Sequence, residues 1–103
     1  MAERLVPSQW TGSLHLDLRN ARGWSAGALD LAVGRDTVQV RHQGRELAIL
    51  DRDQFRDWMI RPQFAYVADD TAWATEMDVT VFQVGRSRFT ITPESMAHLL
   101  TVV

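Results

Sequence analysis

The sequence predicts an α+β domain in which an antiparallel meander sheet, or sheets, of about 6–8 strands carries two short helices. Apolar and polar residues alternate over much of the chain, which is the period of a half-buried strand. The period becomes helical twice, at about residues 52–60 and 93–101, each time behind a favourable N-cap residue. A partly closed β-barrel capped by the C-terminal helix is the alternative architecture for the same pattern.

The first half of the chain has the pattern of strands joined by tight turns. Leu14, Leu16 and Leu18 share one face of the first strand, and the polar residues between them share the other. Alternation continues at 28–33 and through the two following stretches, with glycine-containing turns between them. Short turns between alternating strands predict an antiparallel meander.

A first helix is expected directly after these strands. Asp51 is a good N-cap, and Gln54 stands three residues on, where a capping box has Glu or Gln. Phe55 and Trp58 are three residues apart and share one helical face. The helix at 52–60 is therefore predicted to pack that face on the sheet.

The second half repeats the succession of strands and a helix. A short strand is expected within residues 63–70, and residues 71–84 form one long β-prone run. The apolar parity changes inside that run, which predicts a bulge or a strand buried on both sides. Thr92 is the expected N-cap of the last helix, with Pro93 at its first position.

The two halves resemble each other. Residues 40–59 align with 81–100 without a gap, so that turn glycines and helix caps coincide. A weaker upstream match in another register extends the pseudo-repeat to about 24–60 and 73–103. True duplication and shared folding rules both stay open, because the matched positions are those that such rules dictate. The whole chain, 1–103, is expected to form a single domain.

Composition excludes several classes of site. The chain has no cysteine, so neither a disulfide nor a Cys-ligated zinc is available. It has no lysine, which rules out a Walker phosphate-binding loop, and it has no GxGxxG motif. No cofactor is expected. The N-terminal residues lack the pattern of a signal peptide and no apolar stretch is of bilayer length, so a cytoplasmic protein without a membrane partner is expected.

The charge pattern argues against a nucleic-acid partner. All eleven basic residues are arginine, and they are interleaved with acidic residues to give a net charge of −2. Interleaved charges predict a solvated surface rather than the one-signed stripe that neutralises phosphates. Nucleic-acid binding is therefore the third and least favoured hypothesis.

Catalytic and metal-binding patterns are weak. Asp51 and Asp53 flank an arginine in a DxD that is able to hold a divalent cation, but helix capping accounts for both. His15, His42 and His98 have none of the usual metal-ligand spacings. The sequence therefore predicts no catalytic or metal-ligating residue and disfavours an enzyme.

The leading hypothesis is a protein-interaction or structural module that binds a protein partner or a second copy of itself as a homodimer. Trp10, Trp24 and Trp73 stand beside small and polar residues near predicted strands. Tryptophan is enriched at interface hot spots, so these residues are candidate anchors, with covering the core as the competing role.

A charged face on the first helix is a second candidate interaction surface. Arg52, Arg56 and Asp57 have no counterpart in the aligned half of the chain, so folding rules do not account for them. We therefore expect this face to meet a partner.

A small-ligand or catalytic site is the alternative hypothesis. His15, Asp17 and Arg19 share the polar face of the first strand, where a carboxylate is able to orient an imidazole. A pocket lined by these three side chains is what this alternative predicts.

Overall fold

Eight strands and two helices make up the part of the chain that the computed structural model describes, residues 10–103. Each half of the chain contributes four strands followed by one helix. The first half comprises β1 (Gly12–Arg19), β2 (Ser25–Val33), β3 (Thr37–His42), β4 (Arg45–Asp51) and α1 (Arg52–Ile60). The second half comprises β5 (Tyr66–Ala68), β6 (Thr71–Glu76), β7 (Val79–Val84), β8 (Ser87–Ile91) and α2 (Pro93–Val102).

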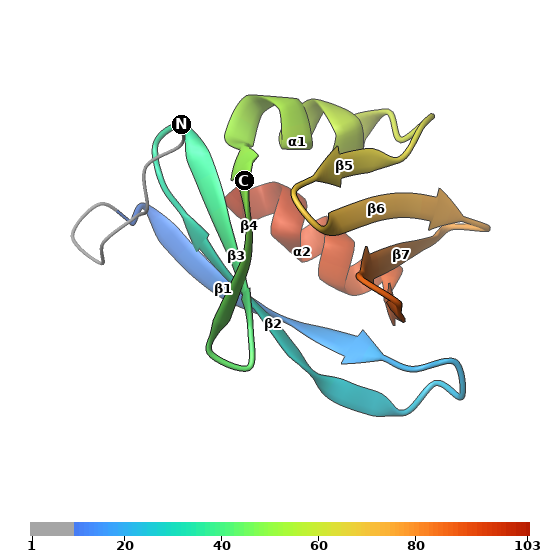
Figure 1. Ribbon diagram of the computed structural model, residues 1–103. Coiled ribbons are helices and arrows are strands. Elements are labelled where there is room, and N and C mark those ends of the chain that lie inside the picture. The colour runs from blue at the N-terminus through green and yellow to red at the C-terminus, as the bar shows by residue number, and fades with distance from the viewer. Residues whose placement is uncertain (1–9) are drawn as a thin grey trace.

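All eight strands belong to one antiparallel sheet in the order β4-β3-β2-β1-β8-β7-β6-β5. The sheet curls until its two edge strands, β4 and β5, approach each other (Figure 1). The α+β meander with two helices is confirmed, and its curl also gives it the barrel-like form of the alternative architecture. The first predicted helix has the observed bounds, and the second extends one residue further, to Val102.

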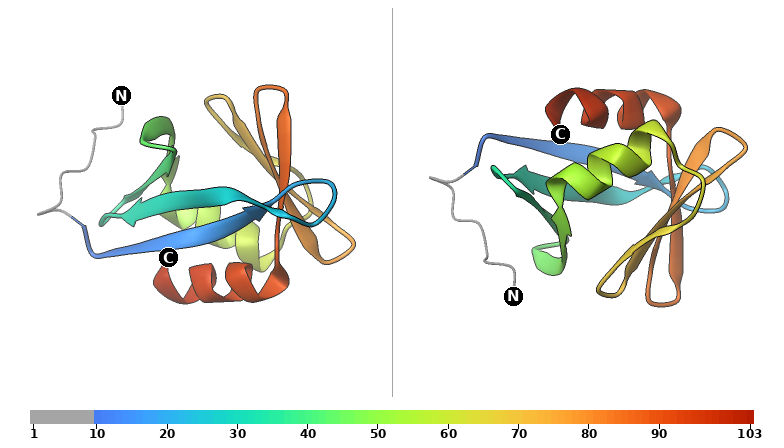
Figure 2. Two further views of the ribbon diagram at one scale, coloured as in Figure 1. Left: turned by 90° about the horizontal axis from the view of Figure 1, so that it is seen from below. Right: turned by 90° about the horizontal axis from the view of Figure 1, so that it is seen from above.

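The core lies between the concave side of the sheet and the two helices. Figure 2 shows both helices on the same side of the strands. An aromatic cluster occupies the centre, where the Trp73 ring lies 4.9 Å from the Phe55 ring and 4.7 Å from the Phe82 ring, centre to centre. Leu99 of α2 belongs to the same buried core. Burial of these side chains is the main stabilising term for a domain without disulfides.

The sequence predicted one long strand at residues 71–84, with a bulge or with both faces buried, but two strands, β6 and β7, lie there. Met77 and Asp78 both have positive φ, 50° and 69°, and turn the chain between β6 and β7. Two successive positive φ values suit the twist of a two-residue hairpin, although neither residue is a glycine. The change of apolar parity therefore marks a turn that lacks the usual residue signal.

A bulge is present instead in β4. The pairing of β3 with β4 shifts between Val40 and Arg41, because Val40 faces Ala48 whereas Arg41 faces Glu46. Leu47 is thus the extra residue. A bulge in an edge strand interrupts the regular presentation of its backbone groups.

The bulge corrects the gap-free alignment of the two halves. β3 and β7 have the same burial pattern and begin at Thr37 and Val79, 42 residues apart. The caps Asp51 and Thr92 are 41 residues apart, because Leu47 has no counterpart in β8. The upstream match is wrong, since it aligns β2 with a segment that crosses the turn between β6 and β7.

Neither helix within residues 10–103 is long and apolar enough to cross a bilayer.

Candidate functional site

The two halves of the sheet meet at two junctions, and in the part of the chain that the structure describes only one of these is joined by strand pairing. At one junction β1 pairs with β8 through Arg19 and Thr90. At the other, β4 and β5 face each other, and within residues 10–103 no strand pairing joins them. We call this gap between β4 and β5 the seam.

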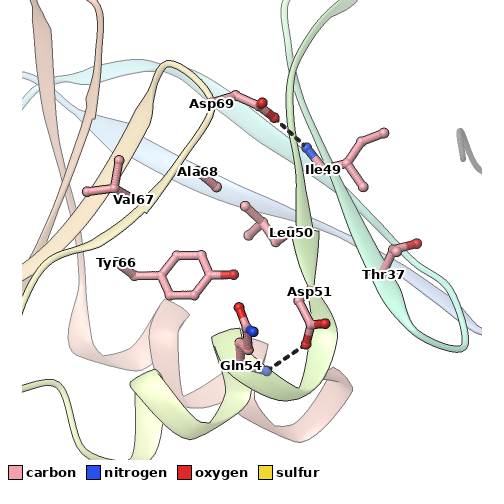
Figure 3. A pocket seen from close by; sticks show the side chains of 9 residues that line it. All are labelled: Thr37, Ile49, Leu50, Asp51, Gln54, Tyr66, Val67, Ala68 and Asp69. Atoms are coloured by element: carbon pink, nitrogen blue, oxygen red, sulfur yellow. Dashed lines mark hydrogen bonds between the residues drawn. The ribbon is translucent and has the colours of Figure 1, made fainter. Parts of the chain in front are cut away.

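A side chain, rather than a strand, occupies the edge of β4 at the seam. The backbone N–H of Ile49 donates to Oδ2 of Asp69 at 3.3 Å (Figure 3). Asp69 lies in the turn between β5 and β6 with φ of 51°, a conformation that Asp tolerates better than most residues. The Asp69 carboxylate therefore takes the place that a strand carbonyl has in a paired sheet.

The seam opens into a cleft of about 390 Å³. Leu50, Tyr66 and Ala68 line it, together with residues of both edge strands and α1. Figure 3 shows the Tyr66 ring reaching across towards β4, with Asp69 at one end of the cleft and Asp51 at the other. Both edge strands therefore border a hollow with a carboxylate at each end.

Tyr66 reports the environment of this cleft. Burial raises the pKa of its hydroxyl above the ordinary value, and the negative charge of Asp51 adds to the rise. A hydrogen bond with the backbone of Asp51 opposes it. Because burial has the largest effect, the neutral hydroxyl is the favoured form.

The structure separates the tryptophans that were predicted as interface anchors. Trp73 is 0% exposed, which corrects the expectation that it anchors an interaction surface. Trp10 is 38% exposed and Trp24 is 64% exposed, so both have free ring surface. The Arg22 guanidinium lies 5.4 Å from the centre of the Trp24 ring. Trp24 belongs to the turn between β1 and β2, on the opposite junction from the seam.

Arg52 differs from the other two residues of the predicted charged face. Its guanidinium donates to the carbonyl oxygens of Val103 at 3.0 Å and Gly34 at 2.8 Å. It thereby ties the start of α1 to the end of α2 and to the turn between β2 and β3. Arg56 and Asp57 are exposed on α1.

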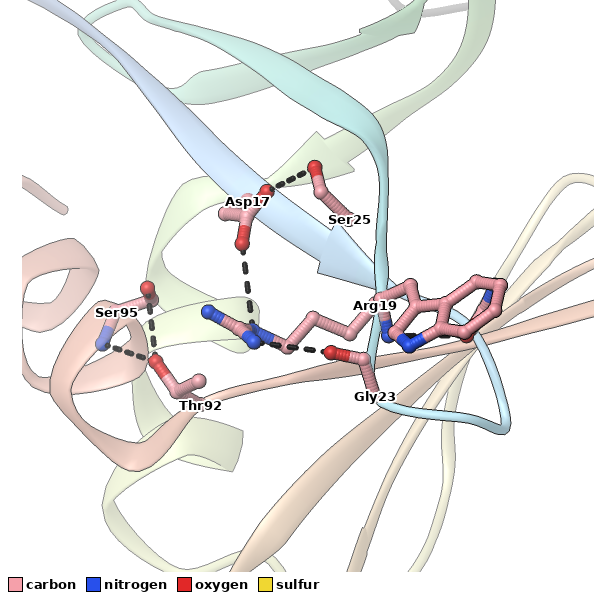
Figure 4. A network of polar contacts seen from close by, with 8 residues as sticks. Asp17, Arg19, Gly23, Ser25, Thr92 and Ser95 are labelled. Carbon is pink, nitrogen blue, oxygen red and sulfur yellow. Dashed lines mark hydrogen bonds and ion pairs between the residues drawn. The ribbon is translucent and has the colours of Figure 1, made fainter.

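The predicted pocket residues do not form one group. His15 pairs across the strands with Asp30 rather than with Asp17. Asp17 accepts from Ser25 Oγ at 2.9 Å and lies 3.4 Å from Arg19 Nε (Figure 4). A separate hollow of about 350 Å³ is bordered by His15 and Trp10, but neither Asp17 nor Arg19 lines it.

Capping explains the DxD motif. Asp51 accepts the backbone N–H of Gln54 at 2.9 Å, as an N-cap does. Across residues 10–103, no group of three or more His, Asp or Glu side chains is placed to hold a metal ion.

Sequence reasoning missed the apolar surface beside the seam. Val67, in β5, is 69% exposed, and Phe64 in the preceding loop is more exposed still. The available signal was the shortness of the strand between Pro62 and the Asp69-Asp70 turn, which leaves little sheet to cover these side chains.

The chain matches no known protein family, no curated protein and no solved structure. The structure therefore identifies the protein only by its fold class, which is a small α+β domain with a nearly closed, eight-stranded antiparallel sheet.

Proposed function

We propose that this protein is a protein-interaction module that binds an extended segment of a partner along the seam. The observation that carries the proposal is the pair of edge strands, β4 and β5, that face each other without pairing. Edge strands present backbone donors and acceptors to any chain that approaches them. Strand addition to such an edge is a common mode of peptide recognition.

The present contacts at the seam are of a kind that a partner is able to replace. Asp69 is exposed, so its carboxylate regains water when it releases the Ile49 N–H. A partner carbonyl then accepts that N–H, and the number of hydrogen bonds is conserved. The exchange therefore makes the Ile49 N–H available for strand pairing with little change in free energy.

Topology sets the direction of the added segment. In a sheet of eight strands with only antiparallel neighbours, the first and last strands run in opposite directions. A segment between β4 and β5 is therefore antiparallel to one and parallel to the other. Antiparallel pairing is the more stable, and β4 has seven residues against three in β5. The segment is expected to run antiparallel to β4.

A pair of variants tests the proposal. Peptides are selected on the wild-type protein from a displayed library of random sequence and then titrated by fluorescence anisotropy. Ile49→Pro removes the N–H that points into the seam, and proline is tolerated at an outward-facing edge position. Ile49→Ala is the matched control, because it shortens the side chain and keeps the N–H.

We expect Ile49→Pro to weaken binding about tenfold or more, and Ile49→Ala to weaken it by less than about threefold. Equal affinities for Ile49→Pro and wild type, or a selection that returns no peptide, would overturn the proposal. Circular dichroism spectra of both variants check that the sheet is intact.

The partner is also allowed to be a second copy of the chain, which would make the protein a homodimer. Sedimentation velocity distinguishes a homodimer from a monomer that binds another protein. Dimerisation that Ile49→Pro abolishes identifies the seam as the contact. A cytoplasmic location is also part of the proposal.

A small-ligand site is the second candidate function, and the hollow beside Trp10 favours it. His15, Asp30 and Arg41 supply polar groups around that hollow, and Leu31 supplies apolar floor. Binding of a small-molecule fragment that shifts the Trp10 indole resonance, and not the Ile49 amide, would support it over the seam.

A further inference from the structure

Resting on the proposed function, we infer that the segment docking in the seam carries arginine or lysine side chains that pair with Asp51 and Asp69. The seam supplies backbone groups for any extended chain, so its selectivity has to come from side chains. Charge is the property in which the cleft is most one-sided.

The cleft has acidic residues and no basic ones among those that line it. Asp51 and Asp69 are its charged lining residues. Asp53 and Asp70 follow them in sequence and are exposed. The intervening Arg52 does not compensate, because its guanidinium is directed to Gly34 and to the end of α2.

The two carboxylates lack a cationic partner within the described part of the chain. The ion pairs found within residues 10–103 join His15 to Asp30, Arg19 to Asp17 and Arg88 to Glu76. Asp51 and Asp69 take part in none of them. An entering cation therefore displaces no existing salt bridge.

Each carboxylate is already oriented by one hydrogen bond. Asp69 accepts the Ile49 N–H through Oδ2, and Asp51 accepts the Gln54 N–H through Oδ1. The second oxygen of each has no hydrogen bond within residues 10–103 and is able to accept from an incoming guanidinium or ammonium. Asp51 keeps its capping hydrogen bond when a segment docks and so stays oriented, whereas Asp69 exchanges the Ile49 N–H for the incoming cation.

The cleft also suits the aliphatic stem of a long basic side chain. Its wall contains Leu50, Ala68 and the half-buried ring of Tyr66 (Figure 3). Arginine and lysine place such stems against apolar surface while the charged head stays near water. An acidic segment meets like charges at both ends of the cleft and is selected against.

Charge-only variants test the inference. Asp51→Asn keeps a good N-cap, and Asp69→Asn keeps an oxygen acceptor for Ile49 and tolerates positive φ. Asp78→Asn is the matched control. It also changes a turn aspartate with positive φ, and it lies at the opposite end of β6 from Asp69.

The peptide is varied in parallel. Each basic residue of a peptide selected on wild type is replaced in turn, arginine by citrulline, its neutral isostere, or lysine by norleucine. Affinities of both peptide forms are measured on wild type, on Asp51→Asn/Asp69→Asn and on Asp78→Asn. The four affinities on wild type and the double Asn variant isolate the pairwise interaction, and those on Asp78→Asn are the control.

We expect selected peptides to be enriched in arginine or lysine. The double Asn variant should bind about tenfold more weakly and less salt-dependently, and Asp78→Asn should bind as wild type does. Neutralising one basic residue should cost about tenfold on wild type and almost nothing further on the double Asn variant.

Failure of this inference is distinguishable from failure of the proposed function. Peptides that need the Ile49 N–H but show no basic preference, and bind the double Asn variant as wild type, overturn the inference alone. A loss on neutralising the basic residue that persists on the double variant also overturns it, because the cation then pairs elsewhere. Insensitivity to Ile49→Pro overturns both.

Discussion

The two halves of the molecule contain the same succession of four strands and a helix, and they differ most in their first strand. β1 has eight residues, whereas its counterpart β5 has three. β1 pairs with β8 at one junction, through its last residue, Arg19. The equivalent pairing of β5 with β4 is absent within residues 10–103. The open seam thus coincides with the shorter of the two first strands.

The other edge of the seam departs from the repeat as well. β4 carries the bulge at Leu47, which β8 lacks. Bulges and short strands are both devices that prevent an edge from pairing regularly. Shared features, such as the caps at Asp51 and Thr92, serve folding in both halves. The short β5 and the bulge in β4 both lie at the seam, where binding is proposed.

The largest effect on stability is expected from the residues that anchor the two helices to the core. Phe55 and Met96 both lie four residues after their caps, but Phe55 is fully buried and Met96 only partly. Phe55→Ala should lower the free energy of unfolding by about 3–5 kcal/mol and Met96→Ala by about 1–2 kcal/mol. Urea denaturation measures both values. Equal losses would contradict the asymmetry of the core.

A smaller effect is expected from Arg52, which has Pro93 as its counterpart. Arg52→Ala removes two charge-assisted hydrogen bonds to carbonyl oxygens and should lower the free energy of unfolding by about 2–3 kcal/mol. Arg56→Ala is the control on the same helix, and its exposed side chain should matter by less than about 0.5 kcal/mol. Thermal unfolding that ranks the two alike would show that Arg52 does not join the halves.

The smallest effect concerns pH and the seam. Burial raises the folded-state pKa of Tyr66 above its unfolded value of about 10. The stability that the neutral hydroxyl contributes is therefore fully present below pH 10, and it is lost as the pH rises towards the folded-state pKa. The near-ultraviolet absorbance of tyrosinate measures the pKa directly, because the chain has one tyrosine. Tyr66→Phe should flatten this part of the stability profile, and a titration midpoint at or below the free-tyrosine value would contradict the burial.

Local sequence rules predicted the elements of the fold better than their relations. Period-two alternation and the caps at Asp51 and Thr92 located most strands and both helices, since these signals depend on neighbouring residues. The turn at Met77 and Asp78 was missed, because Met77 is not typical of a tight hairpin and no glycine follows Asp78. The bulge at Leu47 was missed because it depends on pairing with another strand.

The candidate site could not be predicted from the sequence. The seam arises from how the sheet curls, and no local pattern indicates which two strands remain unpaired. Arg52 illustrates the same limit, because the carbonyls that engage its guanidinium come from Gly34 and Val103. Asp51 was singled out in the sequence and lies at the seam, and there its predicted role was the helix cap that the structure shows.

The most direct test of the account is nuclear magnetic resonance of the complex with a selected peptide, using filtered experiments that detect only contacts between peptide and protein. We expect antiparallel ladder contacts between the peptide backbone and β4 around Ile49, with the Ile49 amide released from Asp69. Backbone contacts that pair β4 directly with β5, with the peptide bound elsewhere, would show a closed barrel and contradict the account.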